Sequence, residues 1–320
     1  MSEFLGHYVD HQMASPFAMA QHSAKIKPIA IDLARRGVLL VASCLRVEIY
    51  GQEHALRNID STIIFSGFSP ERIEGAPAII KRLAEIASGA RSQVLGDNYV
   101  SDQLAKAVKF LDPSLPIFQI VRLAIDIGRA SRERQRFISS LNYYQVARDI
   151  IIDRFQNGEL PDRLYVLGRA MSVCELIRTG VGERFRSTTI VTRNPKSLRK
   201  RLRAWPDIDV ALTRPAEIGH AREPRSVVVI TLADVNDKYQ AMLQRALLRL
   251  EPRAIIDMMP TLALSKEEFV NTSYFTVYDE EFIAAYEESN KKISRKLPLL
   301  LSDIEMTLSA VQTYLSAKAS

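Results

Sequence analysis

The stretch that decides the fold is Arg163–Val173, which reads RLYVLGRAMSV. It begins with a short apolar run rich in branched and aromatic side chains, as is typical of a buried strand, and Gly168 ends that run. A helical pattern then continues to about Thr179, and Thr188–Thr192 predicts a second strand. A strand, a helix and a strand in this order predict a βαβ unit with parallel strands.

The same alternation continues towards the C-terminus. Val227–Thr231 and Ala254–Asp257 predict further strands, with a helical pattern at Lys238–Leu250 between them. Strands that alternate with helices predict a parallel, doubly wound sheet. We therefore expect a Rossmann-like α/β domain over residues 156–278.

The N-terminal part has a different pattern. Val38–Ala42 predicts a buried strand that Val47–Tyr50 continues, and Ile79–Ala87 predicts an amphipathic helix that Gly89 ends. Further helical patterns at residues 98–111 and 117–155 complete an expected α+β domain over residues 1–155. Gln156–Pro161, rich in turn-forming residues, is the expected domain boundary.

The last segment, residues 279–320, is expected to form a long amphipathic helix. Pro298 lies inside the helical pattern and predicts a kink or a break there.

The composition narrows the class of protein. Apolar residues make up 47% and charged residues 25% of the 320 residues, which is typical of a globular protein, and the net charge of +6 favours polyanionic partners. No apolar run approaches the roughly 18 residues of a membrane span, and no secretory leader is recognisable, so we expect a cytoplasmic protein. The two cysteines, Cys44 and Cys174, predict neither a disulfide framework nor a metal site.

Cys44 lies where a buried strand meets a charged segment. A thiol is a strong nucleophile near neutral pH, and a neighbouring guanidinium such as that of Arg46 is expected to lower the pKa of the thiol. The alternative is that Cys44 is a small apolar residue at the end of a strand.

Two segments around this cysteine resemble one enzyme family. Ala42–Tyr50, ASCLRVEIY, resembles the nucleophile segment STCNRTEIY of glutamyl-tRNA reductases, and Ser88–Asp97, SGARSQVLGD, resembles that family's SGLDSxVLGE. Thr192-Arg193 stands where the family has Asn-Arg, and Ile255–Pro260, IIDMMP, stands for its Ile-Asp-x-x-x-Pro. The resemblance covers most of the chain.

The resemblance implies an NADPH-dependent reduction of glutamyl-tRNA to glutamate-1-semialdehyde, the first step of tetrapyrrole biosynthesis, through a thioester on Cys44. Arg82 stands where the family has a histidine and is expected to polarise the ester carbonyl. Arg46 is expected to bind the substrate carboxylate with its planar fork. The implied substrate-binding residues are Ser43, Arg46, Glu48, Ser92, Asp97 and Gln103.

The resemblance also implies a nucleotide site and two macromolecular partners. Arg193 suits a 2′-phosphate and thus NADPH over NADH. The partners are an aminoacyl-tRNA, most simply tRNA-Glu, and a second copy of the chain bound through the C-terminal helix. The expected NADPH-binding residues are Gly168, Arg169, Ala170, Met171, Ser172, Val173 and Arg193.

Several positions depart from the family pattern. Leu45 and Val47 replace an asparagine and a threonine, and Ala170 and Val173 replace the second and third glycines of the nucleotide loop. Val173 is expected to push its helix away from the sheet. The helical bundle that follows the family's long helix has no counterpart, so the family's dimer is not expected to form in its usual manner.

These departures keep two alternatives open. The first is an acyl transferase or esterase that uses the Cys44 thioester without a hydride step. The second is a non-catalytic regulatory paralogue. His11 either matches the family's N-terminal histidine or is a surface histidine.

Overall fold

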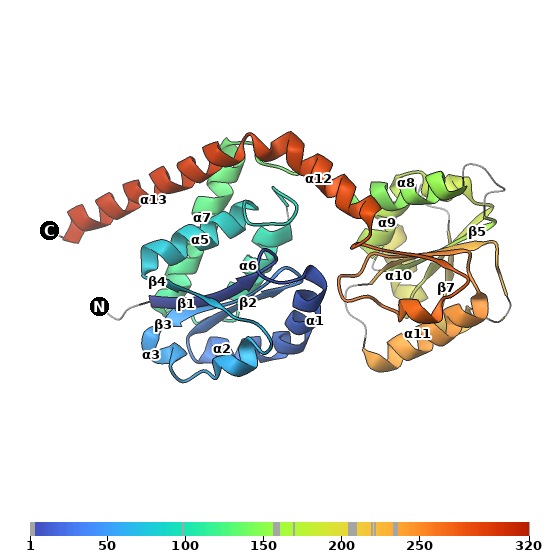
Figure 1. Ribbon diagram of the computed structural model, residues 1–320, viewed down its shortest axis with the longest axis horizontal. Coiled ribbons are helices and arrows are strands. Elements are labelled where there is room, and N and C mark those ends of the chain that lie inside the picture. The colour runs from blue at the N-terminus through green and yellow to red at the C-terminus, as the bar shows by residue number, and fades with distance from the viewer. Residues whose placement is uncertain are drawn as a thin grey trace. The chain divides into compact units, whose positions relative to one another are not determined.

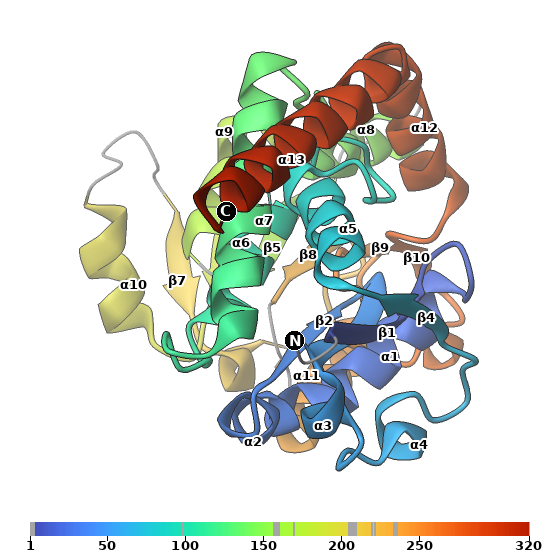
Figure 2. The ribbon, with the colours of Figure 1, turned by 90° about the vertical axis from the view of Figure 1, so that its left-hand side faces the viewer.

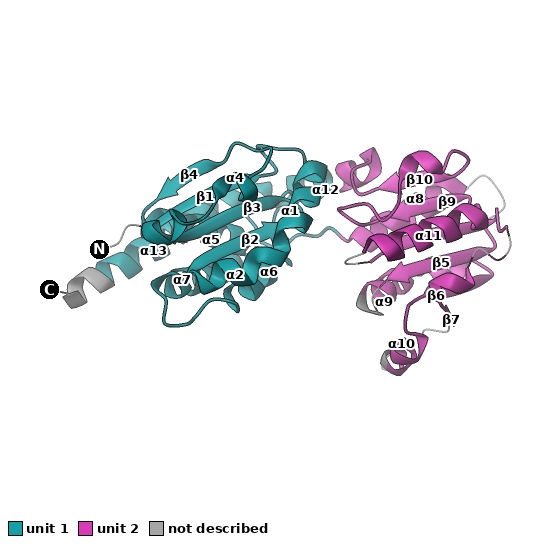
Figure 3. Ribbon diagram, turned by 90° about the horizontal axis from the view of Figure 1, so that it is seen from below, with its two compact units in different colours: residues 1–141, 286–320 teal, residues 142–285 magenta. Residues whose placement is uncertain are grey.

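The protein divides into two compact units (Figure 3). Unit 1 comprises Met1–Leu141 and Tyr286–Ser320, and unit 2 comprises Asn142–Ala285. In the computed structural model the described residues are 4–97, 99–155, 161–168, 170–203, 210–218, 220, 222–232 and 236–319, with only the backbone described at 170, 171, 201 and 315–319. The expected boundary at 156–161 falls largely outside the described residues. Unit 2 instead begins before helix α8 (Tyr143–Phe155), because that helix packs against the sheet of unit 2.

Unit 1 is built on an antiparallel sheet. The strand order is β2-β3-β1-β4. These strands are β1 (Phe4–Asp10), β2 (Val38–Ser43), β3 (Arg46–Gln52) and β4 (Glu71–Glu74). The sequence predicted β2 and β3 but neither β1 nor β4.

Helices cover both faces of this sheet (Figures 1 and 2). One face packs against α1 (Pro16–Ile26), α2 (Ala30–Arg35), α3 (Glu53–Leu56) and α4 (Ser61–Ile64). The other packs against α5 (Ala76–Ser88), α6 (Tyr99–Val108), α7 (Pro116–Arg134) and α13 (Leu297–Ala319), the last of which lies across α5 and α7. Short 3₁₀ helices occur at Lys27–Ile29, Val181–Arg184, Pro215–Glu217 and Lys266–Glu268.

Helices α5 and α7 approach each other closely at Gly128. A Cβ atom at Gly128 would lie 2.4 Å from the backbone oxygen of Ala84, so only glycine allows this crossing. Helix α5 ends at Gly89, which has a φ of +82° and is the left-handed cap that terminates many helices. This cap directs the chain into the loop that carries the second family-like segment.

Unit 2 is a doubly wound parallel sheet. The strands pair in parallel in the order β10-β9-β8-β5-β6-β7. Counted from the first strand of the unit, this is the order 3-2-1-4-5-6 of the Rossmann fold. The strands are β5 (Arg163–Gly168), β6 (Ser187–Val191), β7 (Ala211–Thr213), β8 (Ser226–Thr231), β9 (Ala254–Asp257) and β10 (Ser273–Thr276).

The parallel α/β sheet that the sequence predicts is thus confirmed. The core on one face contains side chains from α8, α9 (Ala170–Arg178) and α10 (Pro195–Leu202), and the core on the other contains side chains from α11 (Asp237–Leu250). Figure 1 shows α8 and α11 on opposite faces of the sheet. Beyond the predicted strands the structure adds β7 and β10.

The predicted C-terminal helix is interrupted near Pro298, as expected. Helix α12 (Glu280–Ser294) ends before α13 begins, and Pro298 lies in the first turn of α13, where its missing N–H disrupts no helical hydrogen bond. Within the described ranges, the structure contains no helix with both the length and the apolar character needed to cross a bilayer.

Candidate functional site

Cys44 lies in the tight turn between β2 and β3. The sequence predicted Cys44 at the end of a strand, but Val47–Tyr50 does not continue that strand, because it belongs to β3 and pairs antiparallel with β2. The turn is closed by the pair Ser43–Arg46, and the Ser43 hydroxyl accepts a hydrogen bond from the Leu45 N–H at 3.3 Å. Burial raises the pKa of the half-buried thiol, Lys27 and Arg46 oppose this effect, and Asp97 adds to it. The expected lowering of the thiol pKa is therefore not found, because desolvation outweighs the nearby positive charges.

Strand β3 directs three polar side chains to one face of the sheet. Side chains alternate along a strand, so Arg46, Glu48 and Tyr50 share a face, whereas Val47 and Ile49 pack in the core of the opposite face. Glu48 has no exposed surface, and its carboxylate accepts a hydrogen bond from the Tyr50 hydroxyl. The guanidinium of Arg46 lies 3.5 Å from the same carboxylate.

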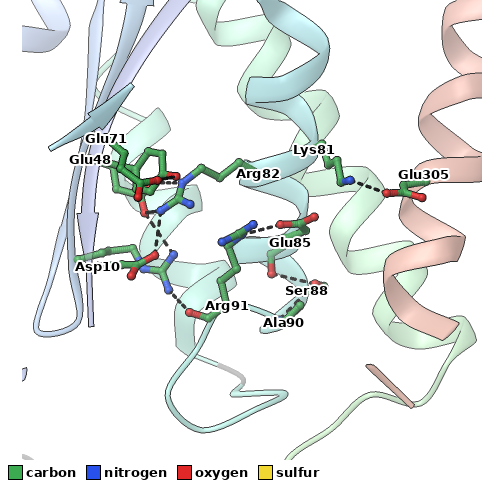
Figure 4. A network of polar contacts seen from close by, with 12 residues as sticks. Asp10, Glu48, Glu71, Lys81, Arg82, Glu85, Ser88, Ala90, Arg91 and Glu305 are labelled. Atoms are coloured by element: carbon green, nitrogen blue, oxygen red, sulfur yellow. Dashed lines mark hydrogen bonds and ion pairs between the residues drawn. The ribbon is translucent and has the colours of Figure 1, made fainter. Parts of the chain in front are cut away.

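Arg82 reaches this face from helix α5 (Figure 4). Its guanidinium donates to both carboxylate oxygens of Glu48, at 2.7 and 3.3 Å, and to Asp10 at 3.1 Å. The guanidinium carbon also lies 3.2 Å from the ring centre of Tyr8, whose hydroxyl bonds Glu71. Burial acts to lower the pKa of Arg82, but Glu48, Tyr50 and Asp10 raise it above its usual value, so Arg82 carries a fixed positive charge.

The four charged groups of this cluster neutralise one another. Arg46 and Arg82 face Glu48 and Asp10, and all four side chains are at most 4% exposed. Burial alone would raise the pKa of Asp10, but the Gln12 N–H and Arg82 hold it below its usual value. The structure thus brings the predicted residues Arg46, Glu48 and Arg82 together, and their direct contact with a substrate stays a prediction.

The loop after α5 borders the same cluster. Arg46 donates to the backbone oxygen of Arg91. The side chain of Arg91 pairs with Glu85 (Figure 4). Ser92 is buried, and its hydroxyl has no hydrogen-bond partner among the described residues. Burial raises the pKa of Asp97.

The other predicted residues of unit 1 are less central. Gln103 is exposed on α6. His11 follows β1, and its buried Nδ1 has no partner among the described residues; burial lowers the pKa of the ring, with Asp10 and Arg46 acting in opposite directions. His11 is therefore not an ordinary surface histidine.

In unit 2, Gly168 and Arg193 lie at the carboxyl edge of the sheet. Gly168 ends β5, which lies between β6 and β8 in the sheet. The strand order reverses here, because β6 is added on one side of β5 and β8 on the other. A Cβ atom at Gly168 would lie 1.9 Å from Oγ1 of Thr231, the last residue of β8. A glycine at this position therefore lets the ends of the two central strands approach each other.

Arg193 follows β6 at the same edge. Its side chain is exposed, and its guanidinium carbon lies 5.1 Å from the ring centre of Tyr239 on α11. Thr192 occupies the place where NAD-binding Rossmann folds carry an acidic residue. This combination suits a phosphorylated ribose better than a free 2′-hydroxyl.

The rest of the nucleotide loop is described in part. Arg169 lies outside the described residues, as do the side chains of Ala170 and Met171, and Ser172 is half-buried. Val173 is completely buried in the core between α9 and the sheet. The side chain of Val173, at the position where the sequence comparison expected a glycine, is thus part of the packed core.

Asp257 is a buried carboxylate at the end of β9 to which sequence reasoning gave no role. It accepts hydrogen bonds from the N–H groups of Met259 and Ala263, at 3.0 and 2.6 Å, and from the Tyr274 hydroxyl at 2.8 Å. Burial raises the pKa of this carboxyl to about 6, against the effect of these donors. The carboxylate fixes the loop that follows β9.

Some residues of the cluster in unit 1 were also missed. Tyr8 and Asp10 stand directly opposite Glu48 and Arg46 in the pairing of β1 with β3. The polar residues alternating with apolar ones at Tyr8–Asp10 and Arg46–Tyr50 are the signal that could have identified this shared face. No three or more His, Cys, Asp or Glu side chains come together as metal ligands in the described part of the chain.

Comparison with known proteins gives one extensive match in sequence. Protein nfe2 of Rhizobium meliloti is 47% identical over 310 residues, which cover 97% of this chain and 99% of that protein. No protein-family model matches the chain.

Solved structures show remoter likenesses. Glutamyl-tRNA reductase from Methanopyrus kandleri has a TM-score of 0.49 at 19% identity over 98% of this chain and 81% of that one. L-tryptophan dehydrogenase from Nostoc punctiforme has a TM-score of 0.34 at 14% identity, with 67% of each chain covered. A chorismate mutase/shikimate 5-dehydrogenase fusion protein from Clostridium acetobutylicum has a TM-score of 0.33 at 14% identity, over 52% of this chain and 63% of that one. At 47% identity over 97% of its length, the chain belongs to the family of protein nfe2.

Proposed function

We propose that the protein is an NADPH-dependent reductase that accepts an acyl group from an aminoacyl-tRNA, most simply glutamyl-tRNA, on Cys44. The observation that carries the proposal is the Rossmann strand order of unit 2, with Gly168 at the reversal point and Arg193 after the next strand. The family-like segments around Cys44 and Ser92 supply the acyl-accepting half of the proposal.

The residues of unit 2 fit NADPH. Gly168 allows the close approach of the central strands, where a Rossmann fold binds the pyrophosphate, and Arg193 offers an exposed cation without a competing acidic residue at Thr192. When bound, NADPH supplies the hydride that converts a thioester to an aldehyde.

The residues of unit 1 provide the acyl acceptor. In the proposed step, the Cys44 sulfur attacks the ester carbonyl carbon and loses its proton, the C–O bond to the tRNA breaks, and the tRNA hydroxyl leaves with a proton. Because burial raises the pKa of the thiol, the proposed step has the sulfur lose its proton as it attacks. Arg82, with its fixed charge, is the proposed carbonyl polariser, and Arg46 the proposed anchor for the carboxylate.

The decisive experiment follows the acyl group by intact-protein mass spectrometry. We expect labelled glutamyl-tRNA to form an adduct on the wild-type protein that NADPH removes, and Cys44→Ser to form no thioester. Cys174 provides the control: it is buried in unit 2, so Cys174→Ala is expected to keep the adduct. A wild-type protein that forms no adduct would exclude the proposal, and release of the adduct as acid or amide without NADPH would indicate an acyl transferase or esterase instead.

Arg193 gives a separate test of the cofactor. We expect Arg193→Ala to weaken NADPH binding about tenfold or more and to change NADH binding less than about twofold, because only NADPH carries the 2′-phosphate that a guanidinium binds. Titration of nucleotide fluorescence measures both affinities.

Arg186 is a matched control for Arg193. It precedes β6 at the opposite end of the strand, is 84% exposed and pairs with Asp162. Arg186→Ala is therefore expected to leave both affinities unchanged. Equal losses for NADPH and NADH in Arg193→Ala would contradict the assignment.

A non-catalytic regulatory role is the second candidate, and one observation favours it. The charges of Arg46 and Arg82 are already balanced by Glu48 and Asp10, and the thiol between β2 and β3 is not activated. If the role is regulatory, Cys44→Ala retains full function in cells, whereas the reductase proposal requires that it lose function.

A further inference from the structure

One face of helix α12 contacts the loop that carries Ser92. Tyr286, Ser289, Asn290 and Ile293 lie on that face because their spacing brings them to the same side of a helix. The Tyr286 hydroxyl accepts a hydrogen bond from the Gln93 side chain at 3.1 Å, and Ser289 lies 3.2 Å from the Ser139 hydroxyl. A Cβ atom at Gly96 would lie 3.0 Å from the Ile293 side chain, which shows how closely helix and loop pack.

Asn290 makes the most specific contact on this face. Its amide nitrogen donates to the backbone oxygen of Gln93 at 2.8 Å, and its amide oxygen accepts from the backbone N–H of Leu95 at 2.8 Å. A side-chain amide presents a donor and an acceptor side by side, so Asn290 acts towards the loop as a neighbouring strand would. Neither an alanine nor an aspartate can make both bonds.

The loop is also held at neighbouring positions. Arg46 donates to the backbone oxygen of Arg91, and Arg132 donates to the backbone oxygens of Gly96 and Asp97 at 2.7 and 3.0 Å. The residues on both sides of Ser92 are thus fixed through their carbonyl groups. The Ser92 hydroxyl between them is buried and has no partner among the described residues, an arrangement that costs free energy unless a ligand or water completes it.

We propose that Asn290 is a positioning residue that holds the Ser92 hydroxyl and the Asp97 carboxyl in place beside the Cys44 turn. The inference rests on the proposed function in taking Ser92 to contact the substrate. It goes beyond that function by assigning a role to a residue of α12, which lies outside both family-like segments of unit 1. Asn290 acts through the loop and does not itself contact the reacting atoms.

Hydrogen exchange and thiol alkylation test this role without requiring turnover. In Asn290→Ala we expect the amides of residues 92–97 to exchange about tenfold faster, because two hydrogen bonds to the loop backbone are lost. Since Asp97 raises the pKa of Cys44, a loosened loop is expected to lower that pKa and to speed alkylation of Cys44 by iodoacetamide at pH 8 about threefold. Because exposure of the thiol by unfolding would also lower its pKa, the unfolding free energy of unit 1 is measured alongside, and a shifted profile at unchanged stability distinguishes the loosened loop from simple destabilisation.

Two further variants complete the test. Glu287→Ala removes an exposed side chain from the same helix and is expected to leave exchange and alkylation unchanged. Asn290→Asp retains the acceptor for Leu95 N–H but loses the donor to Gln93, so its exchange rate is expected to lie between those of the wild type and Asn290→Ala. Unchanged exchange over residues 92–97 in Asn290→Ala, or an unshifted alkylation profile, would overturn the proposal.

The outcome is separable from that of the proposed function. If the wild type forms no adduct with glutamyl-tRNA, the reductase proposal fails, while exchange and alkylation still decide whether Asn290 positions the loop. If the wild type does form the adduct, Asn290→Ala is expected to form it at least about threefold more slowly at saturating substrate, because the loop no longer holds Ser92 in one place. An unchanged rate would refute the positioning role even if the loop exchanges faster.

Discussion

Replacing Glu48 by glutamine is expected to lower the free energy of unfolding of unit 1 by about 3–5 kcal/mol, the usual cost of breaking a buried ion pair on one side. Glu48 has no exposed surface and faces both Arg46 and Arg82. Glutamine keeps the shape of the side chain but removes its charge. It also places an NH₂ group against hydrogen-bond donors, namely the guanidinium groups of Arg46 and Arg82 or the Tyr50 hydroxyl. Two buried guanidinium groups would then share the single carboxylate of Asp10.

The measurement must report on unit 1 alone, because a protein with two units need not unfold in one step. Hydrogen exchange of peptides from β3, followed through a urea series, meets this need. A loss of 3–5 kcal/mol is large relative to the about 5–15 kcal/mol that stabilises a typical protein, so the β3 peptides are expected to lose protection at markedly lower urea.

An exposed ion pair in the same unit provides the control. Glu53 pairs with Arg57 at 2.6 Å, but the Arg57 side chain is 74% exposed. Glu53→Gln is therefore expected to change stability by less than about 0.5 kcal/mol. If Glu48→Gln were as mild as this control, the cluster would not depend on the charge of Glu48, and a role for Glu48 in binding a ligand would become the better explanation for a carboxylate there.

The fold of unit 2 could be predicted because its signals are local. Each central strand is a short apolar run, and each is followed by a helical pattern, which predicts the parallel sheet directly. Strand β7 (Ala211–Thr213) is too short for such a signal. Strand β10 (Ser273–Thr276) contains only two large apolar residues, Tyr274 and Phe275, whereas β8 contains a run of four.

The environment of the site could be predicted only in part, because it depends on contacts distant in sequence. Arg46 lies two residues from Cys44, which favoured an activated thiol, but its charge is compensated by Glu48, and burial then determines the pKa of the thiol. The pairing of Arg82 with Glu48 joins α5 to β3, and no periodic pattern in either segment identifies the partner.

A second large effect is expected from pH acting on Asp257. The folded protein raises the pKa of this carboxyl from 3.8 to about 6, so between these values the folded state binds more protons than the unfolded state. Stability is therefore expected to fall as pH rises through this range, by about 3 kcal/mol in total and by about 1.3 kcal/mol between pH 5 and pH 7. The stabilisation is complete only below the unfolded pKa and is lost above pH 6.

Asp257→Asn isolates this contribution. The variant loses a constant amount of stability, because an NH₂ group replaces one acceptor of the Met259, Ala263 and Tyr274 donors, but that loss does not depend on pH. The unfolding free energies of wild type and variant are measured for unit 2 from pH 5 to pH 7. The advantage of the wild type over the variant is expected to be about 1.3 kcal/mol larger at pH 5 than at pH 7. A difference that stays constant, or that grows in favour of the wild type as pH rises, would show that the three donors outweigh burial and that Asp257 remains an ordinary ionised carboxylate, since hydrogen bonds from donors alone lower the pKa of an acid.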